Sequence, residues 1–353
     1  MGVFYERKYG LSVNILAELT SDKNVSVRRR CCSVLNYFVT CLPDRYDHHQ
    51  RLLPHILSFF NDKDESIRNQ AIKAVDKCGE QYEIEHAGDL IEKRQYAVDG
   101  DYDCCNLMAP LPEPFTTRPR LGSRMFVRCN VKRLAKVLAK ELSNWSSTVR
   151  EKSAKVLCTV IVYCEDSLTT EFDQIFSSTL KALITEIRDV EGEKQEQFSN
   201  ILNSLELIFQ LMGRFVNPKT YLPFLVPRIR GDNDSGTTYA EGGSHSISSR
   251  LASVIALQAL MQGTLPQVLE QSSCEIIDML TSESCTGEYI GSKFKQKCIE
   301  TLVLFIKLTM SYSSTPTSEH EKLFHLKSFL LQFENDMDIK IRNVVKSGLI
   351  LLL

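Results

Sequence analysis

Apolar residues recur at steps of three and four along most of the chain, which is the spacing of one face of an α-helix. The most regular series are Val27, Cys31, Val34, Leu35, Phe38 and Leu42; Ile67, Ala71, Val75 and Cys78; and Val149, Ser153, Val156, Val160 and Cys164. Mostly polar residues stand between them. The pattern predicts amphipathic helices that each bury one face against a neighbour.

A short motif precedes four of the predicted helices. An Asp or Asn is followed five residues later by a β-branched residue and then by an arginine. The four pairs are Asp22 with Arg28, Asp62 with Arg68, Asn144 with Arg150, and Asp336 with Arg342. The first two arginines are 40 positions apart, and the second and third are 82 apart, close to two periods. This period is typical of HEAT or armadillo units, which have about 40–47 residues.

The residue types of the motif suit the start of a helix. The Asp or Asn can accept backbone N–H bonds as a cap, and a second polar residue often follows it, at Asn24, Asp64, Ser147 and Asp338. The arginine can pair with the capping acid of its own or the next repeat. We therefore expect a ladder of ion pairs along the stacked repeats, each of modest energy if it is exposed.

The first helix of a repeat also has a signature. Residues 51–57 and 221–227 are apolar runs that contain a proline, which normally breaks a helix. HEAT units commonly carry such a kinked first helix. We predict an all-α HEAT/armadillo-type solenoid of about seven antiparallel helix pairs, which bury a continuous core only when stacked. The expected pairs span 3–41, 46–80, 124–165, 169–213, 218–262, 264–311 and 318–353.

The predicted domain organisation follows from these pairs. Residues 1–95 hold repeats one and two, and residues 124–353 hold repeats three to seven. Residues 96–123 carry four prolines and several Gly and Asp residues, so they form an inserted loop. Residues 231–246 are a second, flexible loop. The chain ends on an uncapped apolar run, Gly348–Leu353, which predicts that the solenoid continues beyond it.

Composition narrows the classes of function. The net charge of −2 gives no general attraction to nucleic acid or anionic lipid. The sequence has no run of 18 or more apolar residues, which is the length that a membrane-spanning helix needs. Five of the 12 cysteines (Cys31, Cys78, Cys158, Cys164 and Cys298) fall on apolar helix positions. No C-x-x-C pair begins a zinc site. These features favour a protein of the reducing cytoplasm.

The near-matches to metal sites are weak. His320 and His325 resemble a zincin motif, but their spacing of five residues turns the rings about 140° apart on a helix. Residues 232–236 hint at a calcium loop but have Gly at the wrong position. We therefore expect no metal, no cofactor and no small-molecule substrate.

Two further groups of residues, a pair of histidines with nearby acids and the single tryptophan, also have a structural interpretation. His48 and His49, with Asp44 and Asp47, lie where a helix begins, and polar residues there favour capping over catalysis. Trp145 is the one tryptophan and follows a predicted cap. A packing anchor is favoured for it over a ligand platform.

One surface feature points to a partner. Five cations follow one another every fourth residue on one predicted helix: Arg124, Arg128, Lys132, Lys136 and Lys140. Such a series repels itself by some tenths of a kcal/mol per pair. A solvated face balanced by acids from neighbouring helices is the first interpretation. The functional alternative is a docking stripe for an acidic partner segment, assisted by Arg118 and Arg120.

Several stretches, in order and at matching spacing over residues 20–190, resemble one family. They are residues 40–60 (TCLPDRYDHHQRLLPHILSFF), 79–83 (GEQYE), 109–112 (APLP), 118–124 (RPRLGSR), 142–145 (LSNW) and 163–166 (YCED). Together they are similar to the dynein axonemal assembly factor 5 family of HEAT-repeat proteins. The rest of the chain matches only as generic HEAT.

The resemblance implies a non-catalytic cytoplasmic factor for pre-assembly of the dynein arms of motile cilia. Its partners would be axonemal dynein chains, such as an intermediate chain, and co-assembly chaperones. Two alternatives stay open. One is a HEAT adaptor of another kind, either a nuclear transport receptor or a phosphatase regulatory subunit. The other is an enzyme in a helical fold, which would need convergent titratable residues.

Overall fold

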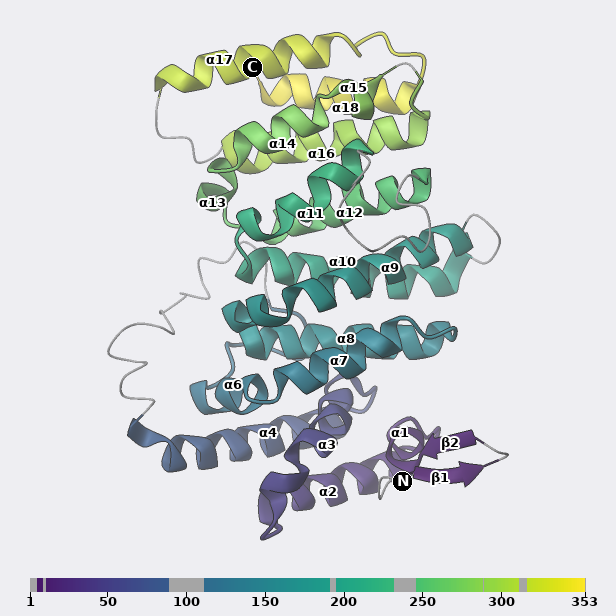
Figure 1. The fold of residues 1–353 in the computed structure, drawn as a ribbon, viewed down its shortest axis with the longest axis vertical. Helices are drawn as coiled ribbons and strands as arrows, with labels where there is room; N and C mark the ends of the chain where they lie inside the picture. The colour runs from purple at the N-terminus through teal and green to yellow at the C-terminus, as the bar shows by residue number, and fades with distance from the viewer. Residues whose placement is uncertain are drawn as a thin grey trace. The chain divides into compact units, whose positions relative to one another are not determined.

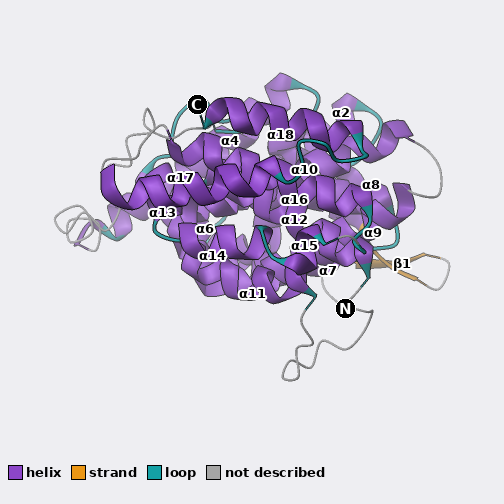
Figure 2. Ribbon diagram, turned by 90° about the horizontal axis from the view of Figure 1, so that it is seen from above, coloured by secondary structure: helices purple, strands orange, loops and turns teal. Residues whose placement is uncertain are grey.

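A computed structural model describes residues 5–8, 11–88, 111–190, 195–231, 246–287, 289–310 and 316–352. Within these ranges the regular secondary structure is helical apart from one short hairpin, so the all-helical class predicted from the sequence is confirmed (Figures 1 and 2). The residues form two compact units, Met1–Thr179 and Leu180–Leu353, and the division falls inside one helix, α9 (Phe172–Val190). Each unit is described by itself.

The first unit begins with a hairpin where the sequence predicted a helix. Strands β1 (Tyr5–Lys8) and β2 (Leu11–Asn14) pair antiparallel, with Tyr5 opposite Asn14. The alternation of apolar and polar residues in Leu11–Asn14 suits a strand better than a helix. Asn14 then caps the short α1 (Ile15–Leu19) by accepting the N–H of Leu16 at 3.1 Å. The expected helix pair over 3–41 is therefore wrong in its first half.

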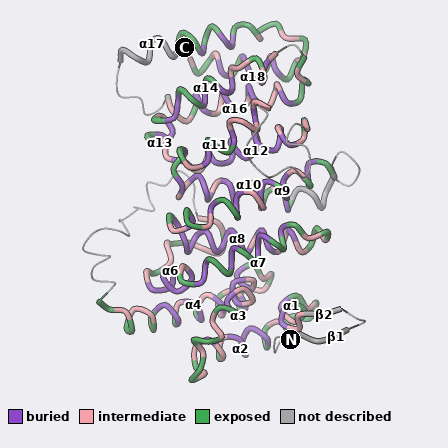
Figure 3. The backbone as a smooth tube through the Cα atoms, in the orientation of Figure 1, coloured by how far each residue is buried: buried purple, intermediate pink, exposed green. Residues whose placement is uncertain are grey.

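The rest of this unit is built from paired helices. They are α2 (Val25–Cys41), α3 (Arg45–Ser58), the 3₁₀ turn η1 (Phe59–Asn61), α4 (Glu65–Glu85), α6 (Leu121–Arg128), α7 (Val131–Leu142), α8 (Ser147–Cys164) and η3 (Glu165–Glu171). Helix α2 packs on α3 and α4, α6 packs on α4 and α8, and α7 packs on α8 and α3. Most of α8 is buried, whereas α7 buries only one face (Figure 3).

The single helix predicted over residues 124–142 is divided into α6 and α7. Asn130 stands at the break, where its side-chain amide donates to the carbonyl of Phe126 at 2.8 Å. Asn side chains compete with the backbone for such bonds and so interrupt helices. The predicted proline loop, residues 96–123, also ends earlier than predicted, because α6 begins at Leu121. Residues 111–120 have no helix, residues 121–123 belong to α6, and residues 96–110 lie outside the described residues.

The second unit continues the same organisation with α10 (Gln195–Phe215), α11 (Pro218–Arg230), α12 (Ile247–Gly263), α16 (Ser292–Met310), α17 (Pro316–Leu331) and α18 (Ile339–Leu351). Three short helices, α13 (Pro266–Glu270), α14 (Ser273–Leu280) and α15 (Glu283–Thr286), replace one long first helix. Helix α12 packs on α10, α11 and α16, and α16 packs on α18. The predicted loop over 231–246 lies almost wholly outside the described residues.

Sequence predictions about the helix prolines and the cysteines are confirmed, and one about a tryptophan is wrong. Proline lies inside α3 at position 54 and inside α11 at positions 223 and 227. The five cysteines expected in apolar helix faces are buried. Trp145 contradicts its prediction as a packing anchor, because it is 91% exposed. In the described part of the chain, no helix combines the length and the apolar character needed to cross a membrane.

Candidate docking surfaces

The arginines of the repeat motif donate hydrogen bonds to backbone carbonyls in the loop before each helix. The guanidinium Nη1 of Arg28, Arg68 and Arg150 donates to the carbonyl of the motif Asp or Asn six residues earlier, in each case at 2.8 Å. Arg342 does the same to Asp336 at 3.0 Å. The motif is therefore a repeated local structure that fixes the entry of the chain into the second helix of a repeat.

The helix caps lie two residues later than the motif residue. The side chains of Asp22, Asp62, Asn144 and Asp336 each accept the N–H of the residue two positions on, at 2.7–2.9 Å. The caps proper are Asn24, Asp64, Ser146 and Asp338, and Ser147 is the first helical residue. The Asp or Asn thus orders a turn that presents the cap, which is a common role for these side chains.

Cross-repeat ion pairs occur in both units. In the first, Arg28 bonds the carboxylate of Asp62 through two nitrogens at 2.7 and 3.0 Å, and the neighbouring Arg29 bonds Asp64 at 2.9 Å. In the second unit, Asp336 pairs with Lys295 at 2.8 Å. The sequence did not indicate Lys295, because the start of α16 lacks the motif.

Two of the five predicted stripe cations belong to a buried group, here called the arginine cluster (Arg118, Arg124, Arg128 and Glu165). Glu165 accepts bonds from Arg118 at 2.7 Å, Arg124 at 2.8 Å and Arg128 at 2.9 Å. Arg120 pairs instead with Glu80 and Glu83 of α4. The break between α6 and α7 separates these cations from the lysines that follow. The continuous stripe predicted on one helix is therefore wrong.

The remaining cations form what we call the α7 lysine face, Lys132, Lys136 and Lys140. All three are exposed, and Val137 between them is 45% exposed. Within the described residues, none of the three has an ion-pair partner within 4.0 Å. Helix α7 buries its other side through Leu134, Leu138 and four further residues, so the lysines have no access to a core partner.

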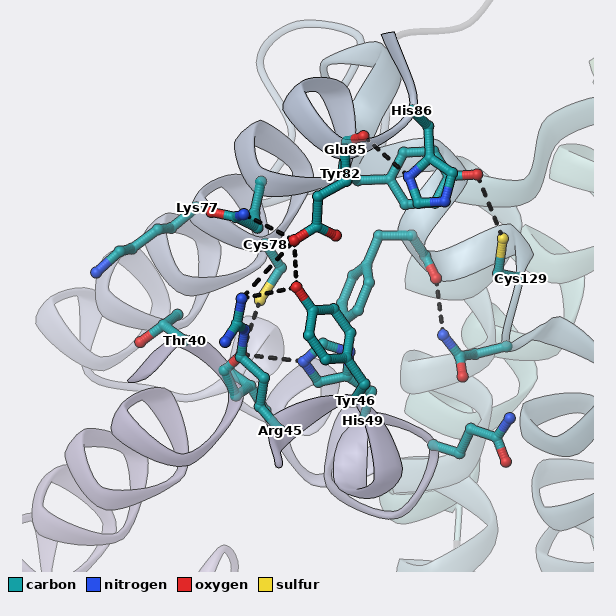
Figure 4. A pocket seen from close by; sticks show the side chains of 15 residues that line it. Thr40, Arg45, Tyr46, His49, Lys77, Cys78, Tyr82, Glu85, His86 and Cys129 are labelled. Atoms are coloured by element: carbon teal, nitrogen blue, oxygen red, sulfur yellow. Dashed lines mark hydrogen bonds and ion pairs between the residues drawn. The ribbon is translucent and has the colours of Figure 1, made fainter. Parts of the chain in front are cut away.

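A hollow of about 220 Å³ lies in the first unit, beside the start of α7 (Figure 4). We call it the tyrosine pocket. Helix α3 contributes Arg45, Tyr46 and His49. Helix α4 and its C-cap contribute Lys77, Cys78, Gln81, Tyr82, Glu85 and His86. Phe126, Cys129 and Asn130 close it from α6 and the α6–α7 junction.

Hydrogen bonds fix the polar edge of the tyrosine pocket. The Tyr46 hydroxyl donates a short bond to Glu85, and the Gln81 amide donates to the same carboxylate at 2.7 Å. The bond to Glu85 raises the pKa of Tyr46 and lowers the pKa of Glu85. The Arg45 guanidinium lies 4.4 Å from the centre of the Tyr46 ring. The Glu85 charge is thus already balanced from within the protein.

The inner wall of the tyrosine pocket is aromatic and uncharged. His49 Nε2 lies 3.0 Å from the Val39 carbonyl, so this nitrogen donates. The His49 and Phe126 rings are nearly perpendicular, with their centres 4.9 Å apart. Burial lowers the pKa of His49, which keeps it neutral near pH 7. Burial also raises the pKa of the Cys78 thiol to about 12, so that thiol is a poor nucleophile. The pocket is suited to receive a side chain rather than to react with one.

The sequence did not identify the tyrosine pocket. Two of its aromatic residues, Tyr46 and Tyr82, lie 36 positions apart on different helices, and no pattern within either helix shows that they line one pocket. Both nevertheless lie in stretches that carry the family resemblance, residues 40–60 and 79–83. The histidine and acid group is divided in the structure: His48 pairs with Asp44 at 3.2 Å, while His49 turns into the pocket.

The two sequence segments that partly resemble metal sites, residues 232–236 and the His320–His325 pair, do not belong to either candidate surface. The segment 232–236 and the side chain of His320 lie outside the described residues, and His325 lies on α17. Where the structure describes side chains, no three His, Cys, Asp or Glu residues group together as metal ligands.

Comparisons with known proteins place this architecture. The family model described as dynein axonemal assembly factor 5, HEAT-repeat domain, matches residues 111–326, and one described as dynein axonemal assembly factor 5-like, TPR repeats, matches residues 7–93. The crystal structure of Kap121p bound to Nup53p has a TM-score of 0.51 and 13% identity, covering 96% of this chain and 33% of that chain. This low identity shows the fold alone, and it agrees with the predicted HEAT-type solenoid.

Two curated relatives carry the same family name. Dynein axonemal assembly factor 5 of Xenopus laevis is 23% identical over 329 residues, which are 87% of this chain and 35% of the relative. The Homo sapiens protein is 27% identical over 214 residues, which are 61% of this chain and 23% of the relative. The chain therefore spans about a third or less of these relatives. Because the HEAT-repeat model alone matches more than half of it, the chain belongs to the dynein axonemal assembly factor 5 family.

Proposed function

We propose that this chain is a non-catalytic cytoplasmic scaffold that holds dynein subunits, together with chaperones, during pre-assembly of axonemal dynein arms. Membership of the assembly factor family is the observation that carries the proposal. The surfaces of the first unit agree with it. They offer an exposed cationic face and an aromatic hollow, both of which suit binding of a protein segment.

The α7 lysine face is the part of the predicted stripe that we retain as a partner-binding surface. Lys132, Lys136 and Lys140 project from one exposed side of a helix, without acids to neutralise them in the described residues. Arg124 and Arg128 are not included, because both are bonded to Glu165. An intermediate chain or another dynein subunit with an acidic segment would fit this face.

Affinity capture of the tagged chain from cells that build motile cilia, read by mass spectrometry, tests the proposal. We expect axonemal dynein chains and chaperones from the cytoplasmic fraction. Recovery of nuclear pore or phosphatase components without dynein chains would overturn the assigned role and favour a HEAT adaptor of another kind. A chain that carries a scrambled tag peptide in the same cells controls for background.

A further inference from the structure

We infer that the tyrosine pocket and the α7 lysine face form one docking site for an acidic segment of a partner protein, with an aromatic side chain of that segment in the pocket. The inference rests on the proposed scaffold role and names the chemistry of the contact. It is carried by the shape of the pocket, by its charge, and by the direction in which α7 leaves it.

The shape of the tyrosine pocket fits one large side chain. Its volume of about 220 Å³ is below the 300–1,000 Å³ typical of pockets for whole small molecules. Tyr46 is 50% exposed at its mouth, and Phe126 presents a buried ring deeper inside. Aromatic rings prefer edge-to-face and offset contacts with one another, and such pairs add to the burial of area. A Trp, Phe or Tyr is thus the anchor that this wall selects.

The charge around the mouth favours an acidic neighbour for that anchor. Glu85 is occupied by Tyr46, Gln81 and, at 3.8 Å, Arg45. Lys77 is exposed and has no ion-pair partner among the described residues. With His49 neutral, the two cations Arg45 and Lys77 outnumber the single carboxylate. A carboxylate of the partner would complete the balance.

The lysines along α7 extend the preference for acidic partner residues away from the pocket. Asn130 lines the pocket and Val131 begins α7, so the lysine face starts within one turn of the pocket. Helix α3, which carries the outer wall, packs beside α7. Successive lysines are four residues, or about 6 Å, apart along the helix axis. Every second residue of an extended peptide is separated by about 6.6 Å, so acids at alternate positions match the three lysines.

A synthetic peptide with one tryptophan followed by three glutamates at alternate positions is the direct probe. Its binding to the whole chain is followed by fluorescence anisotropy of a label on the peptide. We expect Lys132→Glu with Lys136→Glu to weaken binding on the order of tenfold, since two attractions become repulsions. Replacing the peptide tryptophan by alanine should weaken it by a similar factor.

The matched control has the same change of charge elsewhere. Lys23→Glu with Lys63→Glu alters two exposed lysines that lie in the loops before α2 and α4. This double variant should bind the peptide as the unaltered chain does, and both double variants should retain the thermal unfolding midpoint. Equal binding by the two double variants would overturn the assignment to the α7 lysine face.

Cys129 reports the location of the peptide without any substitution in the pocket. Its thiol is exposed at the pocket edge, 3.8 Å from the Tyr82 hydroxyl, whereas Cys274 is exposed in the second unit. We expect the peptide to slow alkylation of Cys129 by iodoacetamide severalfold and to leave Cys274 unchanged, as read by mass spectrometry. Unchanged labelling of Cys129 under saturating peptide would overturn the pocket as the site of the anchor.

Failure of this inference is distinguishable from failure of the proposed function. If the Lys132→Glu, Lys136→Glu variant still captures dynein chains in full, the docking site is wrong and the scaffold role stands. If the peptide binds as expected but no dynein chain is captured from cells, the scaffold role is wrong and the docking site stands.

Discussion

Asp62 serves two repeats at once. Its carboxylate accepts the N–H of Asp64 in its own repeat and the guanidinium of Arg28 from the repeat before. Burial on its own would raise the pKa of Asp62, but the bonds from Arg28 and from the Asp64 N–H lower it overall. The charged form is therefore favoured by folding, and it couples the order of one loop to the position of the preceding helix.

Replacing this carboxylate should cost stability in a pH-dependent way. We expect Asp62→Asn to lower the free energy of unfolding by about 2 kcal/mol at neutral pH. A lowered pKa in the folded state gives stability that is complete above the ordinary value of 3.8 and is lost as the pH falls through the folded value. Urea unfolding over this range measures it, with the exposed Asp47→Asn as control. An equal loss at every pH would contradict the role of the charge.

His55 gives a pH dependence of the same direction for a different reason, because folding favours its neutral form. Burial, together with a smaller effect of the nearby Lys152 charge, lowers its pKa to about 4. As the pH falls from 6.5 to about 4, the unfolded chain takes up the proton first, so stability declines across this window. We expect a loss of at most about 3 kcal/mol, which His55→Gln removes. Urea unfolding at several pH values tests this. The half-exposed His48→Gln should keep the original slope.

The sequence predicted the positions of the helix caps well and the environments of the exposed aromatic side chains poorly. A cap depends on a side chain and the next few N–H groups, so Asn24, Asp64 and Asp338 follow from local sequence. The environment of Trp145 depends on whether another element covers it, and a single helix does not encode that. The same reason hid the placement of Tyr46 and Tyr82, which line one pocket only in the folded chain, where the Tyr46 hydroxyl reaches Glu85 of α4.

Helices α10 and α12 approach each other through glycine. A Cβ added to Gly213 would lie 1.9 Å from the Leu260 carbonyl oxygen, and one added to Gly263 would lie 1.8 Å from the oxygen of Gln210. Both distances are too short for any side chain, so the two helices would have to separate. This contact is the reason that a residue of low helix propensity occurs in both helices.

Gly263→Ala should therefore destabilise the protein although alanine is the better helix former. We expect a loss of about 2–3 kcal/mol in the free energy of unfolding, typical of overpacking against backbone. Gly88→Ala is the control, since a Cβ there meets nothing within 4 Å, and its effect should stay within about 0.5 kcal/mol. Thermal and urea unfolding of both variants decide the point. A stabilised Gly263→Ala would mean that the helices adjust freely.

The arginine cluster joins three segments that are separate in the sequence: residues 111–120, α6 and the end of α8. Glu165 ends α8 with a positive φ of 50°, while its partners lie in the 111–120 segment and on α6. Only the combination of the three arginines explains why a carboxylate is buried there. The sequence indicated the arginines but assigned two of them to the surface, because it gave no sign that an acid 37–47 positions later faces them.

Removal of the acid should be costly, since it leaves buried cations together. We expect Glu165→Ala to lower the free energy of unfolding by about 3–5 kcal/mol. The neighbouring Asp166 is more than half exposed and lies 3.6 Å from Arg128, so Asp166→Ala should cost less than about 1 kcal/mol. Urea unfolding curves compare the two. Similar small losses for both would show that solvent screens the cluster.

Element boundaries show where sequence periodicity stops being informative. The long helices α2, α4, α8, α9 and α10 were all predicted from apolar spacing. The break at Asn130 was not, because the apolar spacing continues across it while one side-chain bond ends α6. The hairpin at the start was missed for a related reason, since a four-residue strand is too short to establish a period.

Across the whole chain, the fold class followed from a repeat, whereas of the candidate sites only the three lysines of the α7 lysine face were indicated by the sequence. A net charge of −2 conceals a local cationic face, because charge is averaged over 353 residues while binding depends on a few neighbours. The stretches that resemble the family are scattered through the first half of the sequence. Folding brings several of them to just two places, the tyrosine pocket and the arginine cluster.

The proposed docking site makes a prediction for ionic strength that belongs to the whole molecule. The α7 lysines are exposed, so their attraction for an acidic segment is screened once the Debye length falls from about 30 Å at 0.01 M to about 8 Å at 0.15 M salt. We expect peptide affinity to fall roughly tenfold over this range, and the Lys132→Glu, Lys136→Glu variant to lose most of that dependence. The two substitutions should change the unfolding free energy little, because these lysines make no internal pairs in the described residues. If both chains showed the same salt dependence, the attraction would arise elsewhere.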